Sequence, residues 1–460
     1  MERVTEDLAA FLAEAQFGDL SEEAIWHAKR CLLDFLGASI GGSSMKRSRI
    51  LANFVRDIGG AQEATVIGYP FRVPCPSAGL ANGAMGHALQ MDDTDWASIA
   101  HIGTEVIPAA LAVAEKVGAD GKELLSSVVL GYEGAMRIGA AVHPSHNSRG
   151  FSPNGTIGVF GAAIAAGKIL GLGKHQMADA IGSAGMQSSG LEEFSYDGSM
   201  GSVLNTGHAT QAGVISALLA QRGFTGSRTI IEGKSGFCRA YSDSWELAGI
   251  VAGLGDRYRI TDIWFKRYPT CAYANAALDV ILDLVVGHDV QQGDVEELCI
   301  KTYDVVEQAL NNPEPSNATA AMLSLPYNAA VAVVRRQVTP REFTEECLLD
   351  GMVRATMKKV KIVVADEELN RLAEGRGRAA IVRIVCHDGT EYEGSIKSPK
   401  GDTLNPFTDE ELFGKFEALT SPILDGERID SIATMVRNLE EVETVRDLTR
   451  LLSFSHPLGE

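Results

Sequence analysis

Apolar residues recur at spacings of three and four along the first half of the chain, from Thr5 to about Leu254. This spacing predicts amphipathic helices, and the glycine and asparagine residues between the apolar runs predict the turns that separate them. The segment from Gly155 to Leu172 is almost free of polar side chains, so we expect it to form a central helix that is packed on all sides. The first half of the chain is therefore predicted to be helical.

The pattern changes after Trp264. Three later segments alternate or cluster β-branched residues, which is typical of strands: 295–306, 358–364 and 380–396. Asp388-Gly389 is typical of a hairpin turn, helical patterns return at 318–337 and 343–357, and the chain is again helical from Asp409. We therefore predict a mainly α protein with a large all-helical domain, formed by residues 1–265 and 401–460, and a smaller inserted α+β lid domain, residues 266–400.

Composition narrows the class of protein. The chain has 460 residues and is 45% hydrophobic, which provides enough core for two domains, and its net charge of −19 argues against nucleic acid or an anionic membrane as a partner. The first residues lack the apolar core of a signal peptide, and no apolar run approaches the roughly 20 residues of a membrane span. These two features predict a cytoplasmic location. The seven cysteines are scattered without a C-x-x-C pair, so we expect reduced thiols.

Motifs for common cofactors are missing from the sequence. Gly155, Gly158 and Gly161 are spaced three apart and do not form a dinucleotide fingerprint, and Ile169 stands where a phosphate loop would place Ser or Thr. There is no G-x-S-x-G nucleophile elbow. We therefore expect an enzyme without metal, nicotinamide or pyridoxal phosphate, and without a cluster of metal-ligating side chains.

The richest stretch of candidate chemistry runs from His87 to Pro108, between two helical patterns. Asp92 and Asp93 are paired carboxylates, and such a pair can supply a general base because two adjacent carboxylates resist ionising together. A helix cap or a turn is an equally good interpretation of the pair. His101 is a candidate acid or base, or alternatively a histidine that is hydrogen-bonded in the core.

A second candidate site lies at the predicted domain junction, in the segment F265-K-R-Y-P. Lys266 and Arg267 could bind a carboxylate of the substrate there, because ammonium and guanidinium groups make strong charge-assisted hydrogen bonds. The alternative is a pair of solvated charges.

Four ordered motifs together carry a family resemblance: H87-A-L-x-M-D-D-T, then R149-G-F-S-P-N-G-T-I-G, then F265-K-x-Y-P, then L323-S-L-P-Y. In these motifs the chain resembles the MmgE/PrpD family, which includes 2-methylcitrate dehydratase, cis-aconitate decarboxylase and iminodisuccinate epimerase. The resemblance implies a helical domain built from both chain ends, an α+β lid, a small di- or tricarboxylate substrate and a homodimer.

The resemblance also implies which residues act. His101, Thr94, Lys266 and Tyr327 match the active-site positions of the family, although one extra residue separates Thr94 from His101. On this basis we assign catalysis to His101, Lys266, Tyr327 and Asp93. The residues expected to bind substrate are Thr94, Asp92, Arg149, Ser152 and Arg267.

Four positions depart from the pattern of the dehydratases and the decarboxylase. The family resemblance implies an Asp, a His, a Lys and a second His where this chain has Gln90, Ser152, Ser202 and Asn205. Several groups that would bind a tricarboxylate or protonate a leaving hydroxyl are therefore replaced. These departures favour a cofactor-independent epimerase that removes and returns an α-proton, most like iminodisuccinate epimerase. The alternatives are a hydro-lyase or decarboxylase of tricarboxylates, and a binding protein that has lost the chemistry.

Overall fold

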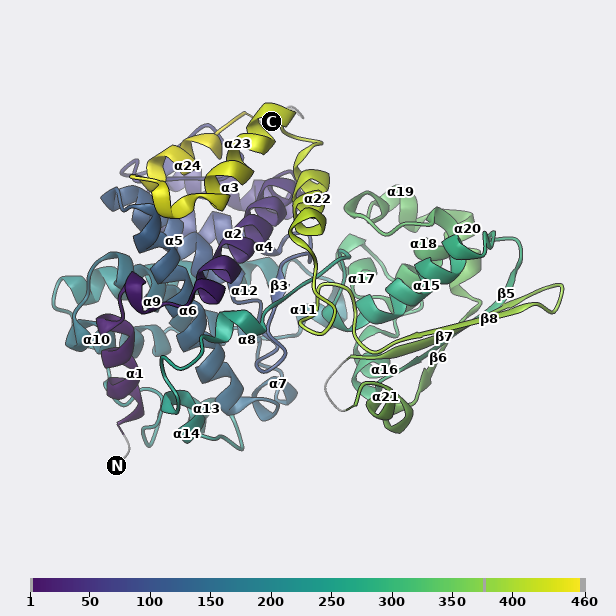
Figure 1. Ribbon diagram of the computed structural model, residues 1–460, viewed down its shortest axis with the longest axis horizontal. Helices are drawn as coiled ribbons and strands as arrows, with labels where there is room; N and C mark the ends of the chain where they lie inside the picture. The colour runs from purple at the N-terminus through teal and green to yellow at the C-terminus, as the bar shows by residue number, and fades with distance from the viewer. Residues whose placement is uncertain (1–2, 375–377, 456–460) are drawn as a thin grey trace.

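The computed structural model describes residues 3–374 and 378–455, which fold into two bodies that stand side by side in Figure 1. The core of the larger body is made of buried side chains from Val4 to Phe265 and from Phe407 to Phe454. The core of the smaller body is made of buried side chains from Tyr268 to Cys386. The chain thus leaves the larger body once and returns to it.

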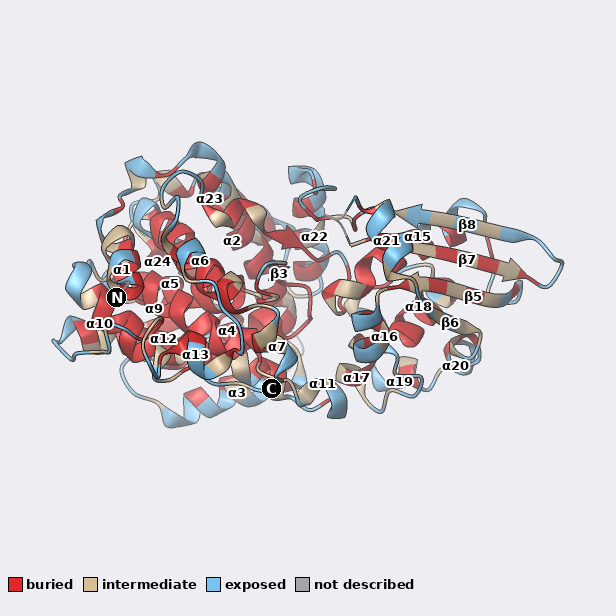
Figure 2. Cartoon of the chain, turned by 90° about the horizontal axis from the view of Figure 1, so that it is seen from below, coloured by how far each residue is buried: buried red, intermediate tan, exposed pale blue. Residues whose placement is uncertain are grey.

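The larger body is a bundle around the apolar helix α9 (Gly158–Ile169), which contacts α5 (Gly103–Val117), α6 (Gly121–Val142) and α12 (Gly201–Gln221). Gly131 of α6 and Gly161 of α9 allow this packing, because a Cβ atom at either position would lie 2.7 Å from the Val106 side chain. The central helix expected from the apolar run 155–172 is present, preceded by the short helix α8 (Pro153–Thr156). Most of its residues are buried, as Figure 2 shows.

Both ends of the chain build this bundle. Helix α22 (Asp409–Thr420) packs on α2 (Glu22–Ser43), so the last segment lies beside one of the first in Figure 1. The remaining helices of the larger body are α1 (Val4–Glu14), α3 (Lys46–Ile58), α4 (Cys75–His87), α7 (Ser145–Ser148), α10 (Lys174–Gly185), α11 (Phe194–Asp197), α13 (Phe237–Tyr241), α14 (Ala248–Val251), α23 (Gly426–Arg437) and α24 (Val445–Leu451). Three 3₁₀ turns complete it: Phe17–Asp19, Arg259–Asp262 and Leu439–Glu441. None of the helices in the described residues is long and apolar enough to cross a membrane.

The larger body is not entirely helical, which corrects the expectation from periodicity. Strands β1 (Ala64–Thr65) and β2 (Arg72–Val73) pair with each other, and β3 (Asp93–Thr94) pairs antiparallel with β4 (Trp264–Phe265). Pairs of two residues have no detectable hydrophobic period, so the sequence pattern does not reveal them. The second pair matters for the site because it joins two segments that lie far apart in the chain.

The smaller body is a four-stranded sheet covered by helices. The strand order is β6 (Val360–Val364), β5 (Val295–Thr302), β7 (Ala380–Cys386) and β8 (Glu391–Ile396), with β5 and β6 parallel and the other pairs antiparallel. Helices α15 (Asn275–Gly287) and α18 (Leu325–Arg335) supply much of the core, and alternate residues of β7 are buried. The strands lie within the three segments that the β-branched pattern predicted.

The other helices of the smaller body are α16 (Asp304–Leu310), α17 (Ala318–Met322), α19 (Glu345–Leu348), α20 (Gly351–Met357) and α21 (Asp366–Leu372), with 3₁₀ turns at Ala272–Ala274 and Pro340–Glu342. The two edge strands of the sheet are more open, since β6 and β8 have no buried residue. Figure 2 shows these two strands at the edges of the sheet, without the red of the core.

Candidate active site

The pairing of β3 with β4 creates the site. Asp93 lies opposite Phe265 and Thr94 lies opposite Trp264, so the preceding residue Asp92 meets the following residue Lys266. The Trp264 ring also stacks on Trp96, with centroids 4.9 Å apart and planes inclined by 10°. The loop after α4 is therefore held against the segment at which the chain leaves the larger body.

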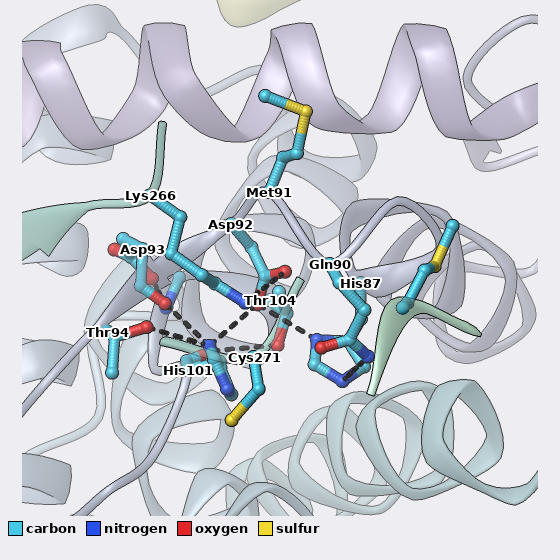
Figure 3. Close-up of polar contacts among 12 residues, drawn as sticks. His87, Gln90, Met91, Asp92, Asp93, Thr94, His101, Thr104, Lys266 and Cys271 are labelled. Atoms are coloured by element: carbon cyan, nitrogen blue, oxygen red, sulfur yellow. Dashed lines mark hydrogen bonds and ion pairs between the residues drawn. The ribbon is translucent and has the colours of Figure 1, made fainter. Parts of the chain in front are cut away.

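Asp92 is the centre of the site. Its Oδ2 atom lies 2.9 Å from Nδ1 of His87 and 2.9 Å from Nδ1 of His101, and its Oδ1 atom lies 3.6 Å from Nζ of Lys266. In Figure 3 these three side chains point toward Asp92. Burial alone would raise the pKa of Asp92, but the two histidines and Lys266 beside it hold that pKa well below the usual value, so the group is a carboxylate.

His87 acts as a fixed hydrogen-bond donor to this carboxylate. Burial lowers the pKa of His87 to about 4, so the ring is neutral at physiological pH. Its Nε2 atom lies 2.9 Å from the Gln90 side-chain nitrogen, which donates to it, and the ring proton therefore sits on Nδ1 and is donated to Asp92. Gln90 adopts φ of 54°, a left-handed conformation that turns its amide toward the ring.

His101 has the opposite arrangement of free and occupied atoms. Its Nδ1 atom is surrounded by oxygens: Oδ2 of Asp92 at 2.9 Å, the carbonyl oxygen of Asp93 at 2.8 Å and Oγ1 of Thr94 at 3.1 Å. A nitrogen that faces a carboxylate and a carbonyl must carry the proton, so Nε2 of the neutral ring holds the lone pair. The His101 side chain is 15% exposed, whereas that of His87 is 2% exposed. His101 is therefore the histidine that can exchange a proton with a substrate.

Lys266 brings positive charge to the same place. Its side chain is fully buried, and among the described residues Nζ has no hydrogen-bond acceptor within bonding distance. Burial lowers the pKa of Lys266, and the negative charge of Asp92 opposes that shift. An ammonium with unused donors in a dry site is suited to stabilise a carboxylate or an enolate oxygen.

The general-base role predicted for Asp93 requires correction. The Asp93 carboxylate accepts hydrogen bonds from the Tyr132 hydroxyl and from the backbone N–H of Gly103, at the start of α5, and only its backbone carbonyl contacts His101. Burial raises its pKa to about 7, and the Tyr132 hydrogen bond opposes that rise. Asp92, which the sequence assigned to substrate binding, is instead the carboxylate that orients the histidines.

Tyr327 also lies apart from this cluster, which corrects the catalytic role predicted for it. The residue is buried in the core of the smaller body, where its ring packs on Phe343. Its hydroxyl donates to the backbone carbonyl of Glu342 at 2.6 Å. The family motif around Tyr327 is present in the sequence, but the side chain stabilises the fold of the smaller body.

The predicted carboxylate clamps face elsewhere. Arg149 pairs with Asp243 at 3.3 Å on the surface, and the exposed Arg267 pairs through Nη1 with the buried Asp279 at 3.0 Å. Ser152 is fully buried just before α8, and Asn154 of that helix accepts a hydrogen bond from the backbone N–H of His101 at 2.9 Å. The α8 segment thus touches the site, while the two arginines are engaged with carboxylates of the protein.

The cluster resembles a metal site in composition. The ligand atoms of His87, Asp92 and His101 lie within 4.8 Å of one another, so the expectation that no cluster of metal-ligating side chains exists is wrong. The geometry favours proton transfer, however, because both Nδ1 atoms already share one carboxylate oxygen and the Lys266 ammonium faces the other. A divalent cation would have to displace these hydrogen bonds next to a positive charge.

Comparison with known proteins agrees with this architecture. The model of the MmgE/PrpD N-terminal domain matches residues 6–249, and the model of the C-terminal domain matches residues 268–441. The chain belongs to the MmgE/PrpD family. The boundary between the two family domains falls at the β4 segment, where the chain leaves the larger body, although the second domain also includes α22 and α23.

Relatives within the MmgE/PrpD family match along the whole chain. Human cis-aconitate decarboxylase is 26% identical over 469 residues, which cover 99% of this chain and 96% of the human protein. A cis-aconitate decarboxylase-like protein of Aspergillus oryzae is 26% identical, with 98% and 97% of the two chains covered, and cis-aconitate decarboxylase of Aspergillus terreus is 25% identical, with 98% and 96% covered. The family is thus one of enzymes, and these relatives are named as decarboxylases.

Sequence analysis missed three residues that build the site: His87, Gln90 and Asn154. His87 is the first residue of the motif H-A-L-x-M-D-D-T and the last residue of a helix, five residues before Asp92. This spacing was the signal that could have indicated a contact between the two side chains. Gln90 was noted only as a departure from the family. Nothing local marks Asn154, because its contact with His101 depends on how α8 packs.

Proposed function

We propose that this protein is a lyase that decarboxylates a small tricarboxylate of the cis-aconitate type. The observation that carries the proposal is the buried Asp92–His101 pair beside the Lys266 ammonium, with no hydrogen bond to Nε2 of His101 from any residue that the structure describes. Full-length similarity to cis-aconitate decarboxylases supports the same class of reaction. The proposal replaces the epimerase as the leading hypothesis, since none of these relatives is named an epimerase.

The site can perform this reaction with its own residues. As the carbon–carbon bond to the departing carboxylate breaks, its electron pair passes into the remaining unsaturated carboxylate, where the Lys266 ammonium stabilises the developing charge. His101 takes up a proton from solvent at Nε2 and then delivers that proton to carbon, which returns the ring to its neutral form. Asp92 stabilises the imidazolium and keeps the ring oriented.

The four departures from the pattern that the dehydratases and the decarboxylase share count most directly against dehydration. Ser202 is buried with no hydrogen-bond partner for its hydroxyl among the described residues, and Asn205 donates to the Leu191 carbonyl. Together with Gln90 and Ser152, these are neutral side chains that cannot protonate a departing hydroxyl. Loss of carbon dioxide needs no such acid.

Epimerisation of a dicarboxylate such as iminodisuccinate is the second candidate. The same observation favours it, because removal of an α-proton by His101 and stabilisation of the enolate by Lys266 also require no acid for a leaving group. An epimerase needs in addition a donor on the opposite face of the carbon. Both reactions therefore require proton transfer by His101 and charge stabilisation by Lys266, and they differ in their product.

Proton NMR in deuterated water tests the proposal. The purified protein is incubated with cis-aconitate, 2-methylcitrate and iminodisuccinate in parallel. A decarboxylase releases carbon dioxide from cis-aconitate and places one deuterium on the product. A dehydratase forms an alkene. An epimerase exchanges the α-proton for deuterium without releasing carbon dioxide or water. Exchange of iminodisuccinate without any turnover of cis-aconitate would replace the first proposal by the second.

We further propose that the enzyme works as a homodimer without an added cofactor. Ile50, Phe54 and Ile58 recur every four residues on α3 and are 51%, 52% and 58% exposed, so they form an apolar stripe on the surface. A second copy of the chain is the partner we expect there. For the cofactor, activity that was lost after EDTA treatment and restored by a divalent ion would contradict the proposal.

A further inference from the structure

The loop after α4, residues 88–95, carries Asp92 and is called the catalytic loop below; it has two faces. Gln90 and Asp92 face the histidines, whereas Leu89 and Met91 line a cleft on the other side, and Figure 3 shows Met91 pointing away from the cluster. The same alternation occurs in the opposing segment, where Lys266 faces Asp92 and Arg267 lines the cleft. The site and the cleft therefore lie on opposite sides of the same two backbone segments, residues 89–92 and 266–267.

The cleft spans both bodies of the molecule. It encloses about 710 Å³, between the end of α2, helix α22 and residues 337–341 of the smaller body. This volume lies within the roughly 300–1,000 Å³ of small-molecule sites. Asp92, His101 and Lys266 are not among the residues that line it, so it is separate from the reacting groups.

The lining is apolar with a cationic border. The apolar side chains include Met45, Leu89, Met91, Val338, Phe407 and Leu419. Four cations lie among the lining residues. Three of them are paired with carboxylates, Arg267 with Asp279, Lys400 with Glu411 and Lys415 with Asp34, and the fourth is Arg341. In the part of the chain that the structure describes, no acidic side chain lies within ion-pair distance of Arg341, which is exposed. The chemistry of the cleft is thus complementary to an anion with a hydrocarbon tail.

We propose that this cleft binds an amphipathic carboxylate, with the tail against Met91 and Leu419 and the head group at Arg341. Di- and tricarboxylate substrates of the catalytic site have no such tail, so the proposal concerns a second, regulatory ligand. Lys415 connects the two sites, because its Nζ atom donates to the Met91 carbonyl at 2.6 Å and to Asp34 at 2.5 Å. A ligand that displaces the Met91 side chain or Lys415 therefore shifts the backbone of Met91, which directly precedes Asp92.

Calorimetric titration of the full-length protein with decanoate tests the binding, and it does not depend on which reaction the enzyme performs. We expect saturable binding of decanoate and none of decylammonium, which carries the same tail and the opposite charge. Ala418→Trp, which fills the cleft from the exposed side of α22, should abolish binding, whereas the adjacent exposed Glu417→Trp should leave it unchanged. Arg341→Gln should weaken binding several-fold, while the exposed Arg371→Gln should not.

Hydrogen exchange tests the connection to the catalytic loop. Decanoate should slow amide exchange in peptides that cover residues 88–95, in the wild type and not in Ala418→Trp. Absence of decanoate binding, equal binding of decylammonium, or binding that survives Ala418→Trp would overturn the proposal. If Ala418→Trp and Arg341→Gln instead changed the oligomeric state of the protein, the cleft would be an interface between copies of the chain, and the proposal would also fail.

Discussion

At the scale of single residues, one buried carboxylate determines where the protons of the site lie. Asp92 accepts from both histidines, and the Gln90 amide fixes the tautomer of His87. His101 is left with a free Nε2 and partial exposure. Of two adjacent and chemically identical aspartates, one thus orients His101, while the other accepts hydrogen bonds from Tyr132 and from the first turn of α5.

His101→Gln should reduce turnover by roughly 10²–10⁴-fold, because a well-placed general acid or base contributes about that factor. Steady-state rates on the substrate identified by NMR measure the effect, and thermal melts should change little. His387→Gln, at an exposed histidine of the smaller body, is the matched control. Near wild-type turnover of His101→Gln would remove this residue from the mechanism.

The raised pKa of Asp93 predicts how stability depends on pH. The folded protein keeps the Asp93 proton up to a pKa of about 7, whereas the unfolded chain releases it near pH 4. The folded state therefore binds more protons between these values, and stability should fall by a few kcal/mol at most as pH rises from 4 to 7. Asp93→Asn should remove this contribution, because a neutral amide can still accept from Gly103 and contact Tyr132.

Chemical denaturation at several pH values between 4.5 and 8 measures this effect in the wild type and in Asp93→Asn. The difference in unfolding free energy between the two proteins should shift in favour of the variant as pH rises. A difference that stays constant across this range would show that Asp93 ionises at its ordinary pKa.

At the scale of elements, short contacts between segments do more for the site than the long helices do. The two-residue pair β3–β4 aligns Asp92 with Lys266, and α8 supplies Asn154 to the backbone of His101. Long helices such as α9 provide the rigid core behind them. Helix α3 is different, because its apolar stripe faces outward and predicts a contact with another molecule.

Phe54→Glu should dissociate the proposed dimer, because it places a charge in the middle of the exposed stripe of α3. Light scattering coupled to size exclusion measures the mass. Asn370→Glu introduces the same charge at an exposed position of α21 and should leave the mass unchanged. A wild-type protein that is monomeric at micromolar concentration would contradict the homodimer.

At the scale of the whole molecule, the chain crosses between the two bodies at two adjacent points. The backbone N–H of Phe265 donates to the carbonyl of Gly401 at 3.1 Å. This hydrogen bond holds together the segment that leaves the larger body and the segment that returns to it. We expect this junction to act as the hinge if the smaller body closes over the site as a lid. Such closure would exclude water from His101 and Lys266 and strengthen their electrostatic effects.

Gly401→Ala should destabilise the protein more than the matched substitution Gly389→Ala does. Gly401 has φ of +95°, and a Cβ atom there would lie 2.0 Å from the Phe265 carbonyl oxygen. Gly389 has a similar φ of +86° but open space around it, so Gly389→Ala should cost only the roughly 1–2 kcal/mol of the left-handed backbone. Thermal melts compare the two, and equal losses would show that the close approach at the junction is unimportant.

The sequence alone determined the elements and their family. Hydrophobic periodicity is a local property, so it predicted the central helix, the strands of the smaller body and the return to helix at Asp409. The motifs located the catalytic loop and Lys266, and the family models confirmed the family that they indicated. Local patterns could identify His101 as a candidate because it lies within the same loop as the aspartates.

Only the tertiary structure decided which of these residues meet. The choice of Asp92 over Asp93, the distance of Tyr327 from the cluster and the engagement of Arg267 with Asp279 all depend on contacts between segments far apart in the chain. The cleft behind the catalytic loop likewise forms only where α2, α22 and the smaller body approach one another. A sequence pattern shows which side chains lie on each face of one helix or strand. Which residues of other elements those side chains contact depends on how the elements pack.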